Sequence, residues 1–170
     1  EAQEVGLDAA GVPIAAGVGV NRQEQIGLLA VGDGRALFER DDESLETAQR
    51  RKLDFAIEAC RLQSGDRVLD VGGGWGSFTE HAGRRGIQVT SLTISAESER
   101  YVADLIQRLQ LPCQILNQDF LSYIAPVPYD AIVILGVMEH LPDYPSVLRQ
   151  CQRLLKPGGR LIMELGWGRA

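Results

Sequence analysis

The chain has 170 residues, of which 24% are charged and 45% hydrophobic, with a net charge of −6 and a pI near 4.9. This length is typical of one domain with a single core. The acidic balance argues against a general nucleic-acid binder, because phosphate contacts need clustered Lys and Arg. We interpret the basic clusters at 50–52 and 84–85 as solvated helix faces, although the first could meet anionic lipid headgroups.

The cysteine, histidine and hydropathy patterns exclude several further classes. Cys60, Cys113 and Cys151 are widely spaced without a C-x-x-C pair, and only His81 and His140 could complete a metal site. We therefore expect no disulfide framework, no metal, and reduced thiols in a cytoplasmic protein. No apolar run approaches the roughly 18 residues of a membrane span, and the N-terminus does not resemble a signal peptide. Any membrane contact is predicted to be peripheral.

The expected secondary structure alternates between strands and helices. Residues 1 to about 34 are rich in Gly and Ala, and we expect a loosely held arm or a short helix there. The predicted helices cover about 44–61, 76–84, 96–109 and 144–155, and the predicted strands cover 67–71, 87–92, 113–116, 130–135 and 159–165. This alternation predicts an α/β fold with an open, mainly parallel, Rossmann-like sheet and helices on both faces.

The most informative stretch is Val68–Gly76, where an apolar strand runs into a turn with four glycines in five residues. Glycines make a tight turn without Cβ atoms, so a nucleotide-like group could approach the N-terminus of the next helix. Asp70 stands at the strand tip, where its carboxylate could hold a cationic group. The alternative is a ligand-free turn, although plain turns rarely need so many glycines.

Two phosphate-binding motifs fit this turn poorly. In a dinucleotide fingerprint the third glycine would stand where Ser77 is, and an acidic residue would end the second strand, which ends here in Thr93-Ile94-Ser95. A P-loop would need a lysine, and none occurs between Lys52 and Lys156. A nicotinamide-dependent oxidoreductase is therefore a disfavoured alternative.

Five segments together resemble the S-adenosylmethionine-dependent methyltransferases of the cyclopropane-fatty-acyl-phospholipid synthase (mycolic acid cyclopropane synthase) group. They are Glu39–Asp42, Leu45–Asp54, Leu69–Ser77, Val89–Ser95 and Gly136–His140. The glycine motif fits any class I methyltransferase, whereas Trp75, Thr93-x-Ser95 and Glu139-His140 narrow the resemblance to this group. The resemblance implies a methyltransferase core over residues 36–170, preceded by an arm or partial lid over residues 1–35.

The resemblance also implies which residues hold the cofactor, because ligands bind at the carboxyl ends of parallel strands. Asp70 and the glycine turn would hold the methionine part of the cofactor. The hydroxyls of Thr93 and Ser95 would bind the ribose. Asp119 would form a hydrogen bond to the adenine, and Phe120 would stack on it. The predicted cofactor-binding residues are Asp70, Gly72, Gly73, Gly74, Trp75, Gly76, Thr93, Ser95, Gln118, Asp119, Phe120 and Gly136.

Some of these positions also have plain structural interpretations. Ser95 could simply cap the next helix, and Asp119 could simply begin a polar loop. A glutamine that helps to hold the ribose in the resembled group corresponds here to Ser98, which weakens that contact. Gly136, at the fourth strand tip, suits a close approach to the sulfonium end of the cofactor.

Glu139 is the predicted catalytic residue, because a carboxylate at the fourth tip could accept a proton directly or through a bound anion. In the resembled enzymes the matching glutamate helps to hold a bicarbonate that acts as the base. The alternative is a surface glutamate that caps a helix, and we expect His140 to be structural.

Several departures from the family pattern affect the expected chemistry. Arg35 lies in the segment that replaces the family's cysteine, and Glu164 corresponds to the histidine of its anion site. The carboxylates of Glu139 and Glu164 would repel bicarbonate unless Arg35 compensates. We therefore expect no cyclopropanation of acyl lipids. The sequence also stops soon after the fifth strand, so we expect a truncated fold with an exposed sheet edge open to homo-oligomerisation.

The sequence therefore predicts transfer of a methyl group from S-adenosylmethionine, with S-adenosylhomocysteine as product, to a lipid-like or small-molecule acceptor that the sequence does not identify. The main alternative is a non-catalytic, cofactor-binding or oligomerising remnant of such an enzyme.

Overall fold

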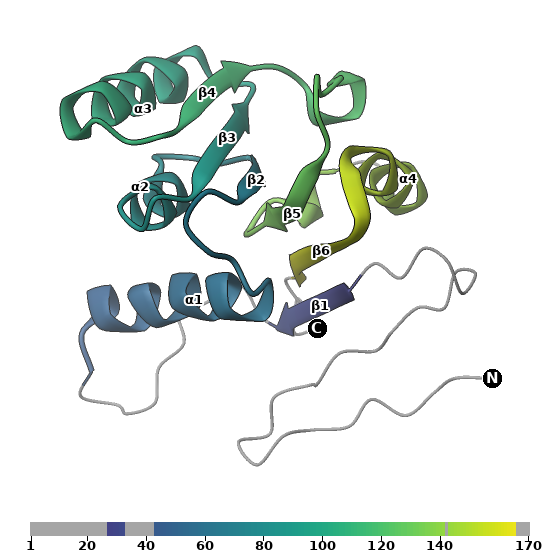
Figure 1. The fold of residues 1–170 in the computed structure, drawn as a ribbon, viewed down its shortest axis with the longest axis horizontal. Coiled ribbons are helices and arrows are strands. Elements are labelled where there is room, and N and C mark those ends of the chain that lie inside the picture. Colours follow the sequence, from purple (N-terminus) through teal and green to yellow (C-terminus); the bar gives the residue numbers. More distant parts are fainter. Residues whose placement is uncertain (1–26, 33–42, 142, 166–170) are drawn as a thin grey trace.

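The computed structural model describes residues 27–32, 43–141 and 143–165, which form an open α/β sheet (Figure 1). The elements in chain order are β1 (Gly27–Gly32), α1 (Leu45–Ala59), β2 (Arg67–Val71), α2 (Ser77–Gly83), β3 (Gln88–Thr93), α3 (Ala96–Leu109), β4 (Gln114–Asn117), η1 (Phe120–Ser122), β5 (Tyr129–Ile134), η2 (Met138–His140), α4 (Tyr144–Leu154) and β6 (Leu155–Leu165).

All strand pairs in the sheet are parallel, and the order is β1-β6-β5-β2-β3-β4. The strand order changes direction at β2, which has β3 on one side and β5 on the other. At such a switch point the connections leave toward opposite faces of the sheet and open a crevice at the carboxyl ends of the strands. The predicted α/β fold with a parallel, Rossmann-like sheet is confirmed.

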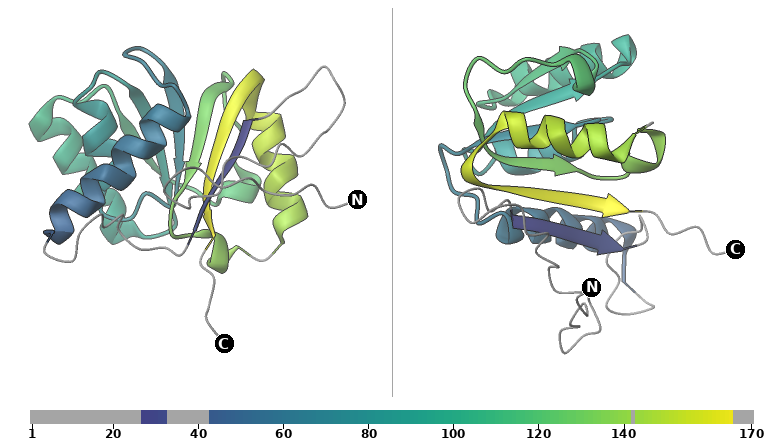
Figure 2. Two further views of the ribbon diagram at one scale, coloured as in Figure 1. Left: turned by 90° about the horizontal axis from the view of Figure 1, so that it is seen from below. Right: turned by 90° about the vertical axis from the view of Figure 1, so that its right-hand side faces the viewer.

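Helices cover both faces of the sheet, with α1, α2 and α3 on one face and α4 on the other (Figure 2). Side chains alternate along β2 between these two layers. Val68 joins the cluster under α1 and α2, whereas Leu69 and Val71 join the cluster under α4. Strands buried on both faces need apolar residues at successive positions, which explains the continuous apolar runs in the sequence.

Capping residues set the helix boundaries close to those predicted. Ser44 Oγ accepts a hydrogen bond from Thr47 N at 3.2 Å and begins α1. Ser95 Oγ accepts one from Ser98 N at 3.2 Å and begins α3. The largest boundary difference is at β6, which begins at residue 155 instead of 159, because Tyr129 pairs with Leu155 ahead of an irregularity in the β5–β6 register.

We predicted a bare sheet edge beside the fifth strand of the core, which is β6. This prediction is wrong, because β1 pairs with β6 along that edge. β1 runs parallel to β6 and pairs with it from Gly27–Arg160 to Gly32–Leu165. Residues 27–32 are therefore neither a loose arm nor a short helix, and self-association through that edge of β6 loses its basis. The rest of the predicted arm, and Arg35, lie outside the described residues. None of the described helices is long and apolar enough to cross a membrane.

Candidate active site

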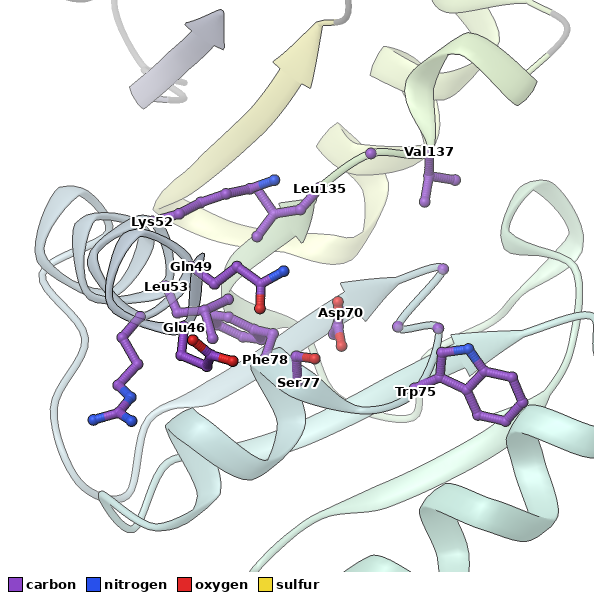
Figure 3. Close-up of a pocket in the computed structure, with 15 residues that line it drawn as sticks. Glu46, Gln49, Lys52, Leu53, Asp70, Trp75, Ser77, Phe78, Leu135 and Val137 are labelled. Carbon is purple, nitrogen blue, oxygen red and sulfur yellow. The ribbon is translucent and has the colours of Figure 1, made fainter. Parts of the chain in front are cut away.

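A pocket of about 540 Å³ lies at the carboxyl end of the sheet, between α1, the glycine turn and the segment after β5 (Figure 3). The lining residues come from these three places and the start of α2: Glu46, Gln49, Arg50, Lys52, Leu53, Asp70, Gly72, Gly73, Gly74, Trp75, Ser77, Phe78, Leu135, Gly136 and Val137. The pocket joins the carboxyl ends of β2 and β5, which are the first and fourth strand tips of the predicted core. The α1 wall was not predicted: Leu45–Asp54 contributed to the family resemblance, but none of its side chains was assigned to the cofactor site.

Asp70 lies at the floor of this pocket with only 3% of its surface exposed. Its Oδ2 accepts hydrogen bonds from Thr79 Oγ1 at 3.2 Å and Ser91 Oγ at 3.3 Å. Burial raises the pKa of Asp70 from its ordinary 3.8 to about 6, and the two hydrogen bonds oppose that rise. The carboxylate is thus held in a fixed orientation and is charged at neutral pH.

The glycines of the turn serve different purposes. The amides of Gly72 and Gly73 donate to Leu92 O at 2.9 and 3.2 Å, which fastens the turn to β3. A Cβ atom at Gly73 would lie 1.9 Å from Ser91 Oγ, so packing alone requires glycine there. A Cβ atom at Gly74 would meet no atom closer than 3.9 Å. Gly74 thus lines the pocket and has open space at the position of a Cβ atom.

The carboxyl ends of β3 and β4, which are the second and third strand tips of the predicted core, lie beside each other but outside the lining of this pocket. Thr93 Oγ1 accepts a hydrogen bond from Ser95 N at 3.1 Å, and Thr93 O accepts one from Gln118 N at 2.9 Å. Asp119 Oδ2 accepts one from Ser122 N at 3.1 Å and caps η1. Ser95 thus has the capping role that the sequence left as an alternative, whereas Asp119 caps η1, a role that the sequence did not predict.

The adenine-side residues differ in exposure. Gln118 and Asp119 are exposed, whereas Phe120 is 4% exposed and belongs to the hydrophobic core. Trp75 is 58% exposed and its ring meets the Tyr101 ring edge-on, with centroids 5.4 Å apart. The contact of Trp75 with Tyr101 was not predicted from the sequence. The one feature that could have indicated it is the position of Tyr101 on the exposed side of α3.

Gly136, Lys52 and Glu164 lie close together beyond the carboxyl end of β5, which is the fourth strand of the predicted core. Lys52 Nζ donates to Glu164 Oε2 at 2.7 Å, although the two residues are 112 positions apart. A Cβ atom at Gly136 would lie 3.7 Å from the same Oε2. The prediction that Lys52 belongs to a solvated basic face is therefore wrong. Lys52 instead balances the charge of Glu164, which we expected Arg35 to offset.

Glu139, the predicted catalytic residue, lies in η2, but its side chain is outside the described part of the structure. His140 is exposed, and its amide donates to Val137 O at 2.9 Å. Within the described residues, no group of three or more His, Cys, Asp or Glu side chains could hold a metal ion.

The model of the mycolic acid cyclopropane synthetase family matches residues 34–166. The chain belongs to this family. Its members are S-adenosylmethionine-dependent methyltransferases, as predicted from the five sequence segments.

Similar proteins include members with known structures. The chain is 34% identical over 131 residues to a probable fatty acid methyltransferase of Mycobacterium tuberculosis, covering 75% of this chain and 30% of that protein. It is 36% identical over 115 residues to a ubiquinone biosynthesis O-methyltransferase of Xylella fastidiosa, covering 66% of this chain and 46% of that protein. The structure resembles mycolic acid cyclopropane synthase CmaA1 complexed with S-adenosylhomocysteine, with a TM-score of 0.70 and 32% identity over 75% of this chain and 46% of that one.

The chain thus spans less than half the length of each of these three proteins. Within the pocket, a Cβ atom at Gly74 would have open space, and the Asp70 carboxylate offers a partner for a positive charge.

Proposed function

We propose that this chain transfers a methyl group from S-adenosylmethionine to a lipid-like or small-molecule acceptor. The observation that carries the proposal is the glycine turn beside Asp70, which opens into a pocket of about 540 Å³. The sulfonium of the cofactor supplies an electrophilic methyl group. The protein's task is then to orient the acceptor and to take up a proton.

In this proposal Asp70 and the backbone around Gly74 hold the methionine part of the cofactor. An ionised Asp70 would pair with the cofactor's ammonium group, and its two hydrogen bonds to Thr79 and Ser91 fix the carboxylate for that contact. The remaining proposed contacts are Gly72, Gly73, Trp75, Gly76 and Gly136 around the turn and fourth tip, Thr93 and Ser95 toward the ribose, and Gln118, Asp119 and Phe120 toward the adenine. Glu139 is the proposed catalytic residue.

A lipid-like acceptor is supported by the probable fatty acid methyltransferase and the mycolic acid cyclopropane synthase among the similar proteins. Bicarbonate is not expected to take part, because Glu164 stands at the position of the family's anion-site histidine and already engages Lys52, a cation of the pocket lining. We therefore do not expect addition of the methyl group to an isolated alkene.

Calorimetric titration with S-adenosylmethionine, S-adenosylhomocysteine and NADH tests cofactor choice. We expect the first two to bind and NADH not to bind; the opposite pattern would contradict the proposal. Transfer is tested with methyl-labelled cofactor and a bacterial lipid extract, followed by mass spectrometry of labelled products. Binding without transfer to any component would favour the non-catalytic alternative, and a cyclopropane ring formed over many turnovers would contradict the expected chemistry.

A further inference from the structure

Gln49 lines the pocket and has no hydrogen-bond partner among the described residues. The residue is exposed, and Figure 3 shows its carboxamide extending from α1 into the pocket, on the side that faces Asp70. Two charged residues of the same lining are already engaged. Lys52 donates to Glu164, and Asp70 accepts hydrogen bonds from α2 and β3. The amide group of Gln49 is therefore available to a ligand in the pocket.

The helical repeat of α1 explains this orientation of Gln49. Residues three and four apart lie on the same face of a helix, so Gln49 shares a face with Lys52 and Leu53. Leu53 packs against the core cluster under α1 and α2, and Lys52 reaches β6, so this face of α1 is turned toward the sheet. Gln49 lies one turn before Leu53 on that face and lines the pocket instead of the core.

The cofactor's amino-acid end carries an ammonium group and a carboxylate on one carbon atom. Under the proposed function the ammonium pairs with Asp70, so the carboxylate must be bound close by. Two carboxylates repel each other at short distance, so the ligand's carboxylate must turn away from Asp70 and needs an N–H donor on another wall of the pocket. The NH₂ group of Gln49 offers two N–H donors on the α1 wall.

Arg50 is the other unengaged donor on this wall, and its position suits the carboxylate less well. It lies about 100° around the helix from Gln49. Glu46, four residues earlier, shares the face of Arg50 and also lines the pocket. An anion beside Arg50 would therefore also face the Glu46 carboxylate, whereas the face of Gln49 carries no acidic residue between Leu45 and Leu53.

We propose that the Gln49 carboxamide donates to the carboxylate of the cofactor's amino-acid end and makes the site selective for ligands that carry this group. The inference rests on the proposed function and deepens it, because it adds a specificity-determining residue to the cofactor site. Asp70 and Gln49 then bind the two charged groups of one amino acid from different walls of the pocket.

The inference can be tested by binding alone, without turnover. S-adenosylhomocysteine and its decarboxylated counterpart, S-adenosyl-3-thiopropylamine, share the adenine, the ribose, the thioether and the ammonium group, and differ in the carboxylate. Calorimetric titration should give about tenfold tighter binding of S-adenosylhomocysteine to the parent protein, because the other ligand cannot accept the hydrogen bond from Gln49.

The substitution Gln49→Met removes the donor and keeps a side chain of similar length. It should bring the two affinities within about twofold of each other and leave the affinity for the decarboxylated ligand unchanged. Gln49→Glu places a second carboxylate on the α1 wall and should reverse the preference. Gln107→Met is the matched control, because Gln107 is an exposed glutamine on α3 outside the pocket lining. This control should keep the parent's preference.

Equal affinity of the parent for the two ligands would overturn the inference, and this comparison needs no variant. A parent preference that Gln49→Met keeps, or a loss of affinity for both ligands alike in that variant, would also overturn it. A preference abolished by Arg50→Met but not by Gln49→Met would assign the carboxylate to Arg50 instead.

The proposed function fails separately. Binding of both ligands without selectivity at Gln49 would refute the inference and leave the cofactor site standing. Selective binding through Gln49 without methyl transfer to any lipid component would refute the function and leave the Gln49 contact standing. Absence of binding by either ligand would refute both.

Discussion

Asp70 combines a buried charge with a contact to the pocket, and this combination predicts a pH-dependent stability. The folded-state pKa of about 6 is above the ordinary 3.8, so the folded protein holds the proton more tightly than the unfolded chain. The stability contributed by this proton is complete below pH 4 and is lost as the pH rises through 6. The loss should total roughly 3 kcal/mol, since one pKa unit corresponds to about 1.4 kcal/mol.

The substitution Asp70→Asn should remove this loss. Denaturant unfolding at pH 4 and pH 7 should show the variant gaining stability relative to the parent as the pH rises, whatever its stability at pH 4. A constant difference between the two proteins across this range would contradict the assigned shift.

The same titration should control cofactor affinity if Asp70 pairs with the cofactor's ammonium group. At pH 5 about a tenth of Asp70 is ionised, so S-adenosylmethionine should bind about tenfold more weakly than at pH 7. Asp70→Asn should bind weakly at both values. Calorimetry gives the affinities, and a variant that keeps the parent's pH dependence would show that another group is responsible.

Two adjacent glycines should respond differently to the same added methyl group. In Gly73→Ala the Cβ atom would overlap Ser91 Oγ, so the turn must shift and stability should fall by about 1–3 kcal/mol. In Gly74→Ala the Cβ atom meets open space, and the φ of +51° costs only about 1–2 kcal/mol. Gly74 lines the pocket, however, so under the proposed function that methyl group would lie beside the cofactor.

Gly74→Ala should therefore lower the affinity for S-adenosylmethionine by about tenfold or more while the protein stays folded. Paired thermal unfolding and calorimetry distinguish the two effects. Unchanged affinity in a folded Gly74→Ala protein would remove this residue from the site.

Between elements, the contact of Trp75 with Tyr101 couples the turn before α2 to α3. The two rings meet edge-on, but both are at least half exposed, so their coupling should be small, about 0.5 kcal/mol. A double-mutant cycle with Trp75→Leu and Tyr101→Leu measures it in unfolding experiments. The same cycle repeated with bound S-adenosylhomocysteine should give a larger value if the cofactor orders the Trp75 ring.

The elements themselves were largely predictable, because each depends on local signals. The apolar run before Gly72, the cap at Ser95 and the alternation of patterns determine where strands and helices begin, and a parallel sheet follows from that alternation. The Lys52–Glu164 pair could not be predicted, since it joins α1 to β6 through the folded sheet. β1 was missed for a similar reason: a short, glycine-rich stretch becomes a strand only because β6 offers it a partner.

At the scale of the whole molecule, the six-residue β1 replaces the eleven-residue β6 as the edge strand of the described sheet, and detaching β1 should promote self-association through β6. N–H groups of neighbouring strand residues point to opposite edges, so of Leu28→Pro and Leu29→Pro only one removes a hydrogen bond to β6. That variant should be less stable and should self-associate in light-scattering measurements, because an unpaired strand edge invites another chain. The other variant is the control. If both remain monomeric and equally stable, β1 does not protect the edge.

The pairing of β1 with β6 also bears on how the domain is made. During translation β1 leaves the ribosome before the other described strands, yet its partner β6 emerges only after all the described elements between the two. The central strands can assemble meanwhile, since each pairs with a strand nearer in sequence, while loop closure delays the β1–β6 contact. The nascent chain must therefore carry β1 without its partner while the segment from α1 to α4 is made, and within the described sheet the β1–β6 pairing is the one that forms last.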